Sequence, residues 1–330
     1  MSLSVTATSI PGQSCPFDSQ ETFPLTLSAA PCHSLDQAVD WVTARSTRLT
    51  EQSMRHGAIL FRGFPLRTAE DFDAFVTAFG CSNFPYEESL SNAVRINRTP
   101  RVFTANEAPS EVSILLHHEM AQTPRFPGRL FFFCEQPADT GGATPVCRSD
   151  QLLYQLKQEC PDFVSDCESK GLLYSNVMPA QNDPDSGMGR SWRSTFRAET
   201  RVDAEAGMRA LGYTWEWMSD DSLRATTPVL SAVRELATGR QSFFNQLIAA
   251  SQGWRDDRKD PSESITFGDG TPLDIDAVQT ASDLADSITF DIPWQRGDVA
   301  LLDNFAVMHG RRTFTGTRKI LVSLVDATKI

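Results

Sequence analysis

Two short segments that lie far apart in the sequence constrain the fold of this chain more than any other feature. One contains His117, His118 and Glu119, and the other runs from Asp303 to Arg311 and contains His309. The chain has only five histidines in 330 residues, and these two segments hold three of them. Two imidazoles and one carboxylate are the ligand set of a mononuclear non-haem iron(II) site with open coordination positions. The fold is therefore expected to bring the two segments to one point.

The spacing inside the first segment suits such a site. In an extended strand, His117 and Glu119 point to the same side and His118 points to the opposite side. A histidine and a carboxylate placed in this way can occupy adjacent positions around a metal ion, and His309 can complete one triangular face. An isolated His-x-Glu is common, so for this segment alone the histidines could also be hydrogen-bonded residues at the end of a strand.

A cation follows the second segment and extends the pattern. Arg318 begins an apolar run, and a buried cation is costly unless it meets an anion. A guanidinium group matches a carboxylate with two parallel hydrogen bonds. We therefore expect Arg318 to bind the distal carboxylate of a dicarboxylic co-substrate whose other end chelates the metal. Lys319, Arg311 and Arg312 are alternatives for this role, and each could instead be a solvated surface charge.

Composition limits the classes of partner. The formal net charge of −12 argues against nucleic acid and anionic membranes, which require a basic face, but it permits a small anionic ligand. The sequence shows no secretory signal and no stretch long enough to span a bilayer. Seven cysteines, with no C-x-x-C pair, are typical of reduced thiols, so we expect a cytoplasmic location.

The hydrophobic pattern predicts both helices and strands. Helical spacing predicts amphipathic helices from Ser34 to about Thr50 and from Thr68 to Phe79, and Ser149 is expected to cap a third. Continuous apolar runs predict buried strands at 58–61, 130–134, 299–302 and 320–325.

This order of elements favours an α+β fold with a β-sandwich or barrel core. Residues 1–33 are rich in Ser, Thr and Pro and are predicted to form an irregular leader. Residues 34–330 are expected to form one domain, because the two segments that carry the metal ligands must meet at one site. A polar, Pro/Gly-punctuated insertion is predicted at about 175–285.

Six blocks of sequence together resemble one family. The chain resembles the taurine dioxygenase and clavaminate synthase-like group of iron(II)/2-oxoglutarate oxygenases, and among these it looks closest to the proteins known simply as clavaminate synthase-like. The resemblance runs from about Gly57 to Val325. It is carried by residues 101–107, 117–122, 141–145, 192–196, 266–270 and 293–314.

The resemblance implies a double-stranded β-helix, or jelly roll, with flanking helices. It implies Fe(II), 2-oxoglutarate and dioxygen as cofactor and co-substrates. It also implies roles for individual residues: iron ligands at His117, Glu119 and His309, a hydrogen bond from Thr144 to 2-oxoglutarate, and pairing of Arg318 with its distal carboxylate. Thr144 could instead be a turn residue that follows two glycines.

One departure from the family pattern concerns the last strand. The family often shows an Arg-Arg pair or a further arginine four residues along, where this chain has Lys319 and Val322. The choice between Arg318 and Lys319 therefore stays open. The departure also removes a cation that some relatives use to hold an anionic substrate.

The implied reaction is oxidation of an unactivated C–H bond, by hydroxylation or by desaturation or oxidative cyclisation. A glutamate as the third ligand resembles the branch that acts on amino acids, so we expect a small amino-acid-like substrate. Trp192, Arg193 and Asn245 are the candidate substrate-binding residues, with Arg193 on the substrate carboxylate. Alternatively, Trp192 belongs to the core and Arg193 to the surface.

Two other classes of function remain open. The same three ligands could hold zinc and an activated water in a hydrolase, which would leave Thr144 and Arg318 without a role. A non-catalytic jelly-roll binding protein would keep the core but would not need all three ligands. Glu119 argues against a halogenase, in which a small residue replaces the carboxylate ligand.

Overall fold

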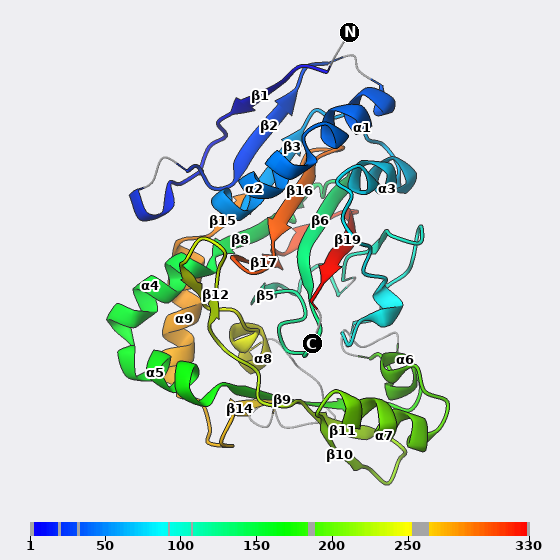
Figure 1. The fold of residues 1–330 in the computed structure, drawn as a ribbon, viewed down its shortest axis with the longest axis vertical. Coiled ribbons are helices and arrows are strands. Elements are labelled where there is room, and N and C mark those ends of the chain that lie inside the picture. The colour runs from blue at the N-terminus through cyan, green and yellow to red at the C-terminus, as the bar shows by residue number, and fades with distance from the viewer. Residues whose placement is uncertain are drawn as a thin grey trace.

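The computed structural model describes residues 3–18, 21–31, 34–91, 93–106, 108–183, 189–252 and 264–328. Glu107 and parts of the predicted leader and insertion lie outside these ranges. The largest sheet has seven strands in the order β1-β2-β3-β16-β6-β19-β4 (Figure 1). These strands are β1 (Val5–Thr8), β2 (Leu25–Ala29), β3 (Ala58–Arg62), β4 (Phe103–Thr104), β6 (Pro127–Gln136), β16 (Val299–Asp303) and β19 (Lys319–Ala327). The four strands predicted from apolar runs are therefore confirmed, as β3, β6, β16 and β19.

A second sheet contains two of the predicted metal ligands. Its strands, in the order β15-β8-β17-β5, are all antiparallel to their neighbours. Across this sheet His309 lies opposite His117 on one side and Val146 on the other. The pairing brings the two distant segments side by side. The strands are β5 (Ile114–His117), β8 (Thr144–Arg148), β15 (Phe290–Ile292) and β17 (Val307–Arg311).

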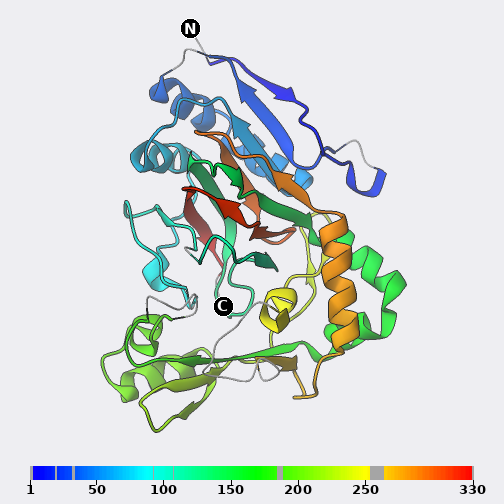
Figure 2. The ribbon, with the colours of Figure 1, turned by 180° about the vertical axis from the view of Figure 1, so that it is seen from behind.

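The inner strands of the seven-stranded sheet, such as β6 and β16, are buried on both faces. Successive side chains of a strand point to opposite faces, and on β6 Phe131 and Phe133 pack with the amino-terminal helices. Leu130 and Phe132 pack in another cluster with Val146 of the second sheet. Burial on both faces explains why the run at 130–134 is apolar without alternation. The helices α1 (Leu35–Thr43), α2 (Ser46–His56) and α3 (Ala69–Thr77) lie on the outer face (Figure 2).

Local signals set the ends of these helices. The predicted helix starts at Ser34 and Thr68 are confirmed, and both residues form capping boxes, at the starts of α1 and α3. The single helix predicted to run to about Thr50 is wrong, because α1 ends at Thr43 and α2 begins at Ser46, after Arg45, whose φ is −131°. The break contains neither glycine nor proline, so the sequence carried no signal for it.

The predicted cap at Ser149 is also wrong, by one residue. Helix α4 (Ser149–Glu159) has Arg148 at its N-cap position, and no side chain caps the helix there.

The predicted irregular leader contains two strands. Strand β1 pairs antiparallel with β2, and β2 pairs parallel with β3, with Leu25 opposite Ile59. Leu25 and Leu27 are buried against the helices of the outer face. These strands are short and lie at the sheet edge, so the Ser, Thr and Pro around them masked the apolar signal.

The region predicted as an insertion is built from regular elements. A third sheet has the strand order β10-β11-β9-β14, and β9 leads from α5 toward α6 and α7 (Figure 1). Helix α8 packs against β5 and α9 packs against α4. The fold is thus a mixed α and β structure, as predicted. None of the described helices is long and apolar enough to cross a membrane. The strands of the third sheet are β9 (Leu172–Met178), β10 (Thr214–Trp217), β11 (Leu223–Thr226) and β14 (Ile265–Phe267). The helices are α5 (Pro161–Lys170), α6 (Trp192–Phe196), α7 (Arg201–Ala210), α8 (Leu247–Gln252) and α9 (Ile275–Ser287).

Small elements complete the described chain. Two short strand pairs are β7 (Thr140–Gly141) with β18 (Phe314–Thr315), and β12 (Arg234–Glu235) with β13 (Gln241–Ser242). Two 3-10 turns are η1 (Pro16–Asp18) and η2 (Tyr86–Glu88).

We expect Phe133→Ala to lower the free energy of unfolding by about 3–5 kcal/mol. The ring is fully buried and stacks on Phe72, with centroids 5.1 Å apart, on the face of β6 away from the second sheet. Urea unfolding followed by circular dichroism measures the loss. A loss below about 1 kcal/mol, within the range of ordinary surface substitutions, would contradict this account of the core.

Candidate metal centre

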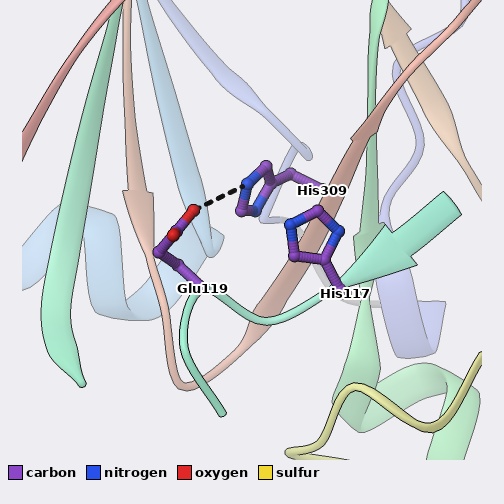
Figure 3. A group of neighbouring side chains, drawn as sticks. All are labelled: His117, Glu119 and His309. Atoms are coloured by element: carbon purple, nitrogen blue, oxygen red, sulfur yellow. Dashed lines mark ion pairs between the residues drawn. The ribbon is translucent and has the colours of Figure 1, made fainter. Parts of the chain in front are cut away.

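Three side chains meet at one edge of the second sheet (Figure 3). His117 ends β5, Glu119 follows it in the next turn, and His309 lies in β17. One ligand atom from each residue lies within 4.8 Å of the others, and Nε2 of His309 is 3.4 Å from Oε2 of Glu119. The strand pairing therefore places two imidazoles and one carboxylate close enough to hold one metal ion.

The position of Glu119 depends on Asn304, which is fully buried. The Oδ1 atom of Asn304 accepts a hydrogen bond of 2.8 Å from the Glu119 backbone N–H. Its Nδ2 donates to the backbone carbonyls of Glu119, at 3.0 Å, and of Pro127, at 2.8 Å. The carbonyl of Asn304 accepts from Nδ1 of His118. The side chain and the backbone carbonyl of Asn304 thus fix the segment that follows β5.

His118 does not join His117, Glu119 and His309, and it is absent from the lining of the cavity that these three residues share. Its ring packs on Phe244, with centroids 4.8 Å apart, and burial lowers its pKa to about 3, so it is neutral. This placement agrees with the expectation that His118 points away from His117 and Glu119.

The charge states of the triad fit a divalent metal. Burial, followed by the neighbouring His309, lowers the pKa of His117 to about 4, so its imidazole is neutral at pH 7. Its Nδ1 donates to the carbonyl of Leu115 at 2.7 Å, which leaves Nε2 as the lone-pair nitrogen. Burial alone would raise the pKa of Glu119, but the charge of Arg95 and the hydrogen bond with His309 lower it to about 2. A neutral imidazole and an ionised carboxylate are the forms that bind metal.

The triad lines a cavity whose wall combines apolar side chains with several polar and charged groups. Such a lining is typical of small-molecule sites. Besides the triad, the lining consists of Arg95, Ala105, Asn106, Ile114, Phe132, Thr144, Gly310, Arg311, Arg318 and Ile320.

Arg318 and Thr144 are in contact in this cavity. Nε of Arg318 donates to the carbonyl of Gly142 at 2.8 Å, and one terminal nitrogen donates to Oγ1 of Thr144 at 3.1 Å. Trp294 also donates to this Oγ1, at 3.0 Å, so the hydroxyl proton of Thr144 is available to a ligand. Burial lowers the pKa of Arg318 to about 10, which leaves it cationic at pH 7. Within the described ranges, no carboxylate pairs with it.

A close approach explains the glycine beside Arg318. Gly142 has φ +69°, and a Cβ atom there would lie 2.9 Å from Cβ of Ala138 and 3.1 Å from Cδ of Arg318. Only glycine lets the turn before β8 pass this near to the guanidinium stem.

The other cations considered for the same role have different environments. Arg311 donates to the backbone carbonyls of residues 106, 108, 109 and 112, so its terminal nitrogens hold that loop in place. Arg312 forms ion pairs with two aspartates, and Lys319 is exposed. Of these four residues, Arg318 is the cation in the cavity whose terminal nitrogens pair with no backbone carbonyl or carboxylate of the described residues.

The residues predicted to bind substrate lie elsewhere. Trp192 is fully buried in a separate cluster and donates to the carbonyl of Asp221. Arg193 stacks over the Trp192 ring at 4.2 Å and pairs with Asp221. The side chain of Asn245 donates to a backbone carbonyl, and its own carbonyl accepts from the backbone N–H of His118. None of the three lines the cavity, so the structure does not bring them to the triad.

Sequence reasoning missed two residues of this site. No role was predicted for Asn304, although an asparagine directly after a buried strand is a candidate for a buried hydrogen-bonding role. Arg95 lies in a segment without motif or periodicity, and no local signal marks it.

With the fold and geometry in place, comparisons with known proteins can be stated. The family model described as "Taurine catabolism dioxygenase TauD, TfdA family" matches residues 21–324. The chain is 39% identical over 313 residues, 94% of each chain, to a clavaminate synthase-like protein of Arabidopsis thaliana. It is 29% identical over 291 residues, 82% of each chain, to the dapdiamide synthesis protein DdaC of Enterobacter agglomerans.

Solved structures agree at the level of the fold. AAD-2 in complex with Mn(II) and N-oxalylglycine superposes with a TM-score of 0.53 at 12% identity, covering 100% of this chain and 99% of that one. A taurine dioxygenase from Burkholderia xenovorans gives a TM-score of 0.52 at 15% identity, covering 98% and 89%.

The chain belongs to the TauD, TfdA family of dioxygenases. It is an Fe(II)- and 2-oxoglutarate-dependent dioxygenase, and the predicted family and class of enzyme are confirmed.

We expect Asn304→Ala to weaken binding of Co(II) or anaerobic Fe(II) by about 10- to 100-fold, because residues that orient metal ligands contribute on this scale. Isothermal titration calorimetry measures the affinity. The control is Phe133→Ala, which destabilises the core on the face of β6 away from the second sheet and should keep the wild-type affinity while folded. Equal metal affinities in Asn304→Ala and wild type would show that Asn304 does not position Glu119.

Proposed function

We propose that the chain binds Fe(II) through His117, Glu119 and His309, and that it oxidises an unactivated C–H bond of a small amino-acid-like molecule. One observation carries this proposal. A single cavity holds both a three-donor metal set and a buried guanidinium that has no carboxylate partner among the described residues.

The donor set supports iron as the metal. Two histidines and one carboxylate on a triangular face leave positions open for a chelating co-substrate and dioxygen. The hydrogen bond from Nδ1 of His117 to Leu115 fixes the ring so that Nε2 is free to bind. His309 presents its Nε2 toward Glu119, on the same side as the carboxylate.

Arg318 and Thr144 support 2-oxoglutarate as the co-substrate. We propose that Arg318 pairs with its distal carboxylate and that the Thr144 hydroxyl donates a hydrogen bond to it. The contacts of Arg318 with Gly142 and Thr144 fix the orientation of the guanidinium group before any ligand binds. A zinc hydrolase would need neither residue in this cavity.

The chemistry of this site combines a redox metal with exclusion of water. Bound iron(II) with 2-oxoglutarate supplies the power to oxidise a C–H bond with dioxygen, releasing succinate and carbon dioxide. Phe132, Ile114 and Ile320 form apolar walls, which limit water near the reacting carbon. Hydroxylation is the simplest outcome, and desaturation or cyclisation differs only in the fate of the oxidised substrate.

Three broader features belong to the same proposal. We propose that the core is a double-stranded β-helix, which is supported by two sheets that share one apolar cluster and both line the cavity. Residues 34–330 are proposed to form one domain. A cytoplasmic setting is supported by cysteines that are free wherever the structure describes them.

Anaerobic titration of the apoprotein with Fe(II) and 2-oxoglutarate tests the proposal. We expect the visible absorption band of the iron chelate in wild type and its absence in His309→Ala, because two ligands bind iron far more weakly than three. Tight zinc binding without a band and without succinate formation would instead favour a hydrolase. Failure to bind any metal would favour a non-catalytic binding protein.

Arg318→Gln is expected to raise the 2-oxoglutarate concentration for half-saturation of the band by about 10- to 100-fold, since a charge-assisted pair is lost. Iron affinity should stay within about twofold, because Arg318 contacts no triad residue. The matched control is Arg312→Gln, which removes a cation of the neighbouring turn that pairs with surface aspartates. Equal half-saturation in the two variants would remove Arg318 from the proposed site.

A further inference from the structure

We propose that Arg95 anchors a carboxylate of the substrate, so that the molecule oxidised at this site is an acid. This inference rests on the proposed function, because it takes the metal to be bound by the triad and 2-oxoglutarate to be bound by Arg318. It replaces Arg193, whose side chain lies outside the cavity, as the residue that binds the substrate carboxylate.

Arg95 lies in the segment between η2 and β4 and lines two cavities. One is the cavity of the triad. The other, with a volume of about 200 Å³, is lined also by Tyr86, Asn97, Arg190 and further residues of this region. A group bound at Arg95 is therefore next to the metal ligands, and the second cavity offers space and polar partners for the rest of a larger molecule.

The hydrogen-bonding capacity of Arg95 is largely unused. Its side chain is only 8% exposed. Within the described part of the chain it makes one hydrogen bond, from a terminal nitrogen to Oε1 of Glu119, at the long distance of 3.4 Å. Its buried Nε has no hydrogen-bond partner among the residues that the structure describes. A buried donor without a partner costs free energy, so this guanidinium is poised to gain one.

Two other buried arginines nearby show what a structural role looks like. Arg190 donates to the carbonyls of Glu87, Ser89 and Ser91, among other acceptors. Arg311 donates to four backbone carbonyls. Arg95 donates to no backbone carbonyl of the described residues. It is therefore not needed to hold a loop in place.

Aromatic rings hold the guanidinium of Arg95 without using its N–H groups. Its central carbon lies 5.2 Å from the ring centroid of Tyr86 and 5.5 Å from that of Phe103. Cation–π contacts stabilise the charge on the flat faces of the group. The edges of the group, which carry the donors, stay available for an anion. Such preorganisation reduces the entropy lost on binding.

The contact with Glu119 does not use the full hydrogen-bonding capacity of Arg95. A guanidinium and a carboxylate pair best through two short parallel hydrogen bonds, whereas this pair has one long contact. A divalent ion at the triad competes for the same carboxylate. The charge of Arg95 is then left with a weaker partner, and a second carboxylate can supply the missing bonds.

A comparison of how acids and their primary amides bind tests the proposed role of Arg95 directly. Wild type and variants would be loaded anaerobically with Fe(II) and 2-oxoglutarate and titrated with free L-amino acids and short aliphatic acids, each beside its primary amide. Binding is measured as a change in the visible band of the chelate. The variants are Arg95→Gln and Arg95→Lys, with Arg98→Gln as the matched control, because Arg98 lies in the same segment with a half-exposed side chain.

We expect at least one acid to change the band in wild type, with its amide binding about 10- to 100-fold more weakly. Arg95→Gln should lose this preference, Arg95→Lys should keep part of it, and Arg98→Gln should match wild type. Affinity for 2-oxoglutarate should stay within about twofold of wild type in every variant, since Arg318 is intact. Affinity for Fe(II) should not fall in Arg95→Gln, because the change removes a positive charge that contacts Glu119.

Several results would overturn the inference. They are equal binding of acids and amides by wild type, acid binding that survives in Arg95→Gln, or a panel in which no acid binds. Weaker Fe(II) binding by Arg95→Gln, with acids and amides affected alike, would make Arg95 a positioning residue for Glu119. Absence of the chelate band in wild type would instead be a failure of the proposed function.

Discussion

The antiparallel pairing of β5 with β17 is the constraint on which the site depends. It places His309 opposite His117, and β17 also pairs with β8, so His309 lies on an inner strand of its sheet. Because side chains alternate along a strand, a slip of one residue would turn His309 to the other face. The apolar cluster between the two sheets, which includes Val307 and Val146, opposes such a slip. Packing of the core thus determines where the side chains of the triad lie.

Buried polar side chains around the cavity divide into two groups. Asn304 and the terminal nitrogens of Arg311 donate to backbone carbonyls, and they fix the segments that carry Glu119 and the loop at 106–112. The terminal nitrogens of Arg95 and Arg318 donate to no backbone carbonyl of the described residues, and both arginines line the cavity. Buried polar groups with partners stabilise a unique structure, whereas free ones lower stability unless a ligand pairs with them. A ligand in this cavity can supply partners to both arginines.

Patterns that depend on local sequence could be predicted, and contacts between distant segments could not. The strands beginning at Ala58 and Val299 follow from apolar runs, and Ser34 follows from a capping box. The break near Ala44 and the strand at Leu25 depend on tertiary packing and β-pairing that no local pattern encodes. The same holds for the site. The triad carries a recognisable spacing, whereas Arg95 reaches it from a segment without any motif. Trp192 was misplaced for the opposite reason, because a conspicuous aromatic–basic pair proved to be core and surface.

The positive charge of the cavity favours anions both as the co-substrate and as the substrate. The molecule carries a net charge of −12, yet its cavity gathers Arg95 and Arg318 around one carboxylate, that of Glu119. Arg311 also lines the cavity, and its charge adds to theirs although its terminal nitrogens donate to four backbone carbonyls. A divalent ion would add two further positive charges, and a dianionic 2-oxoglutarate would offset those two. The positive charge of the arginines then still exceeds that of the single carboxylate, and in a site of low dielectric constant this excess favours a further anion. The charge of the cavity and the free donors of Arg95 therefore lead to the same class of molecule.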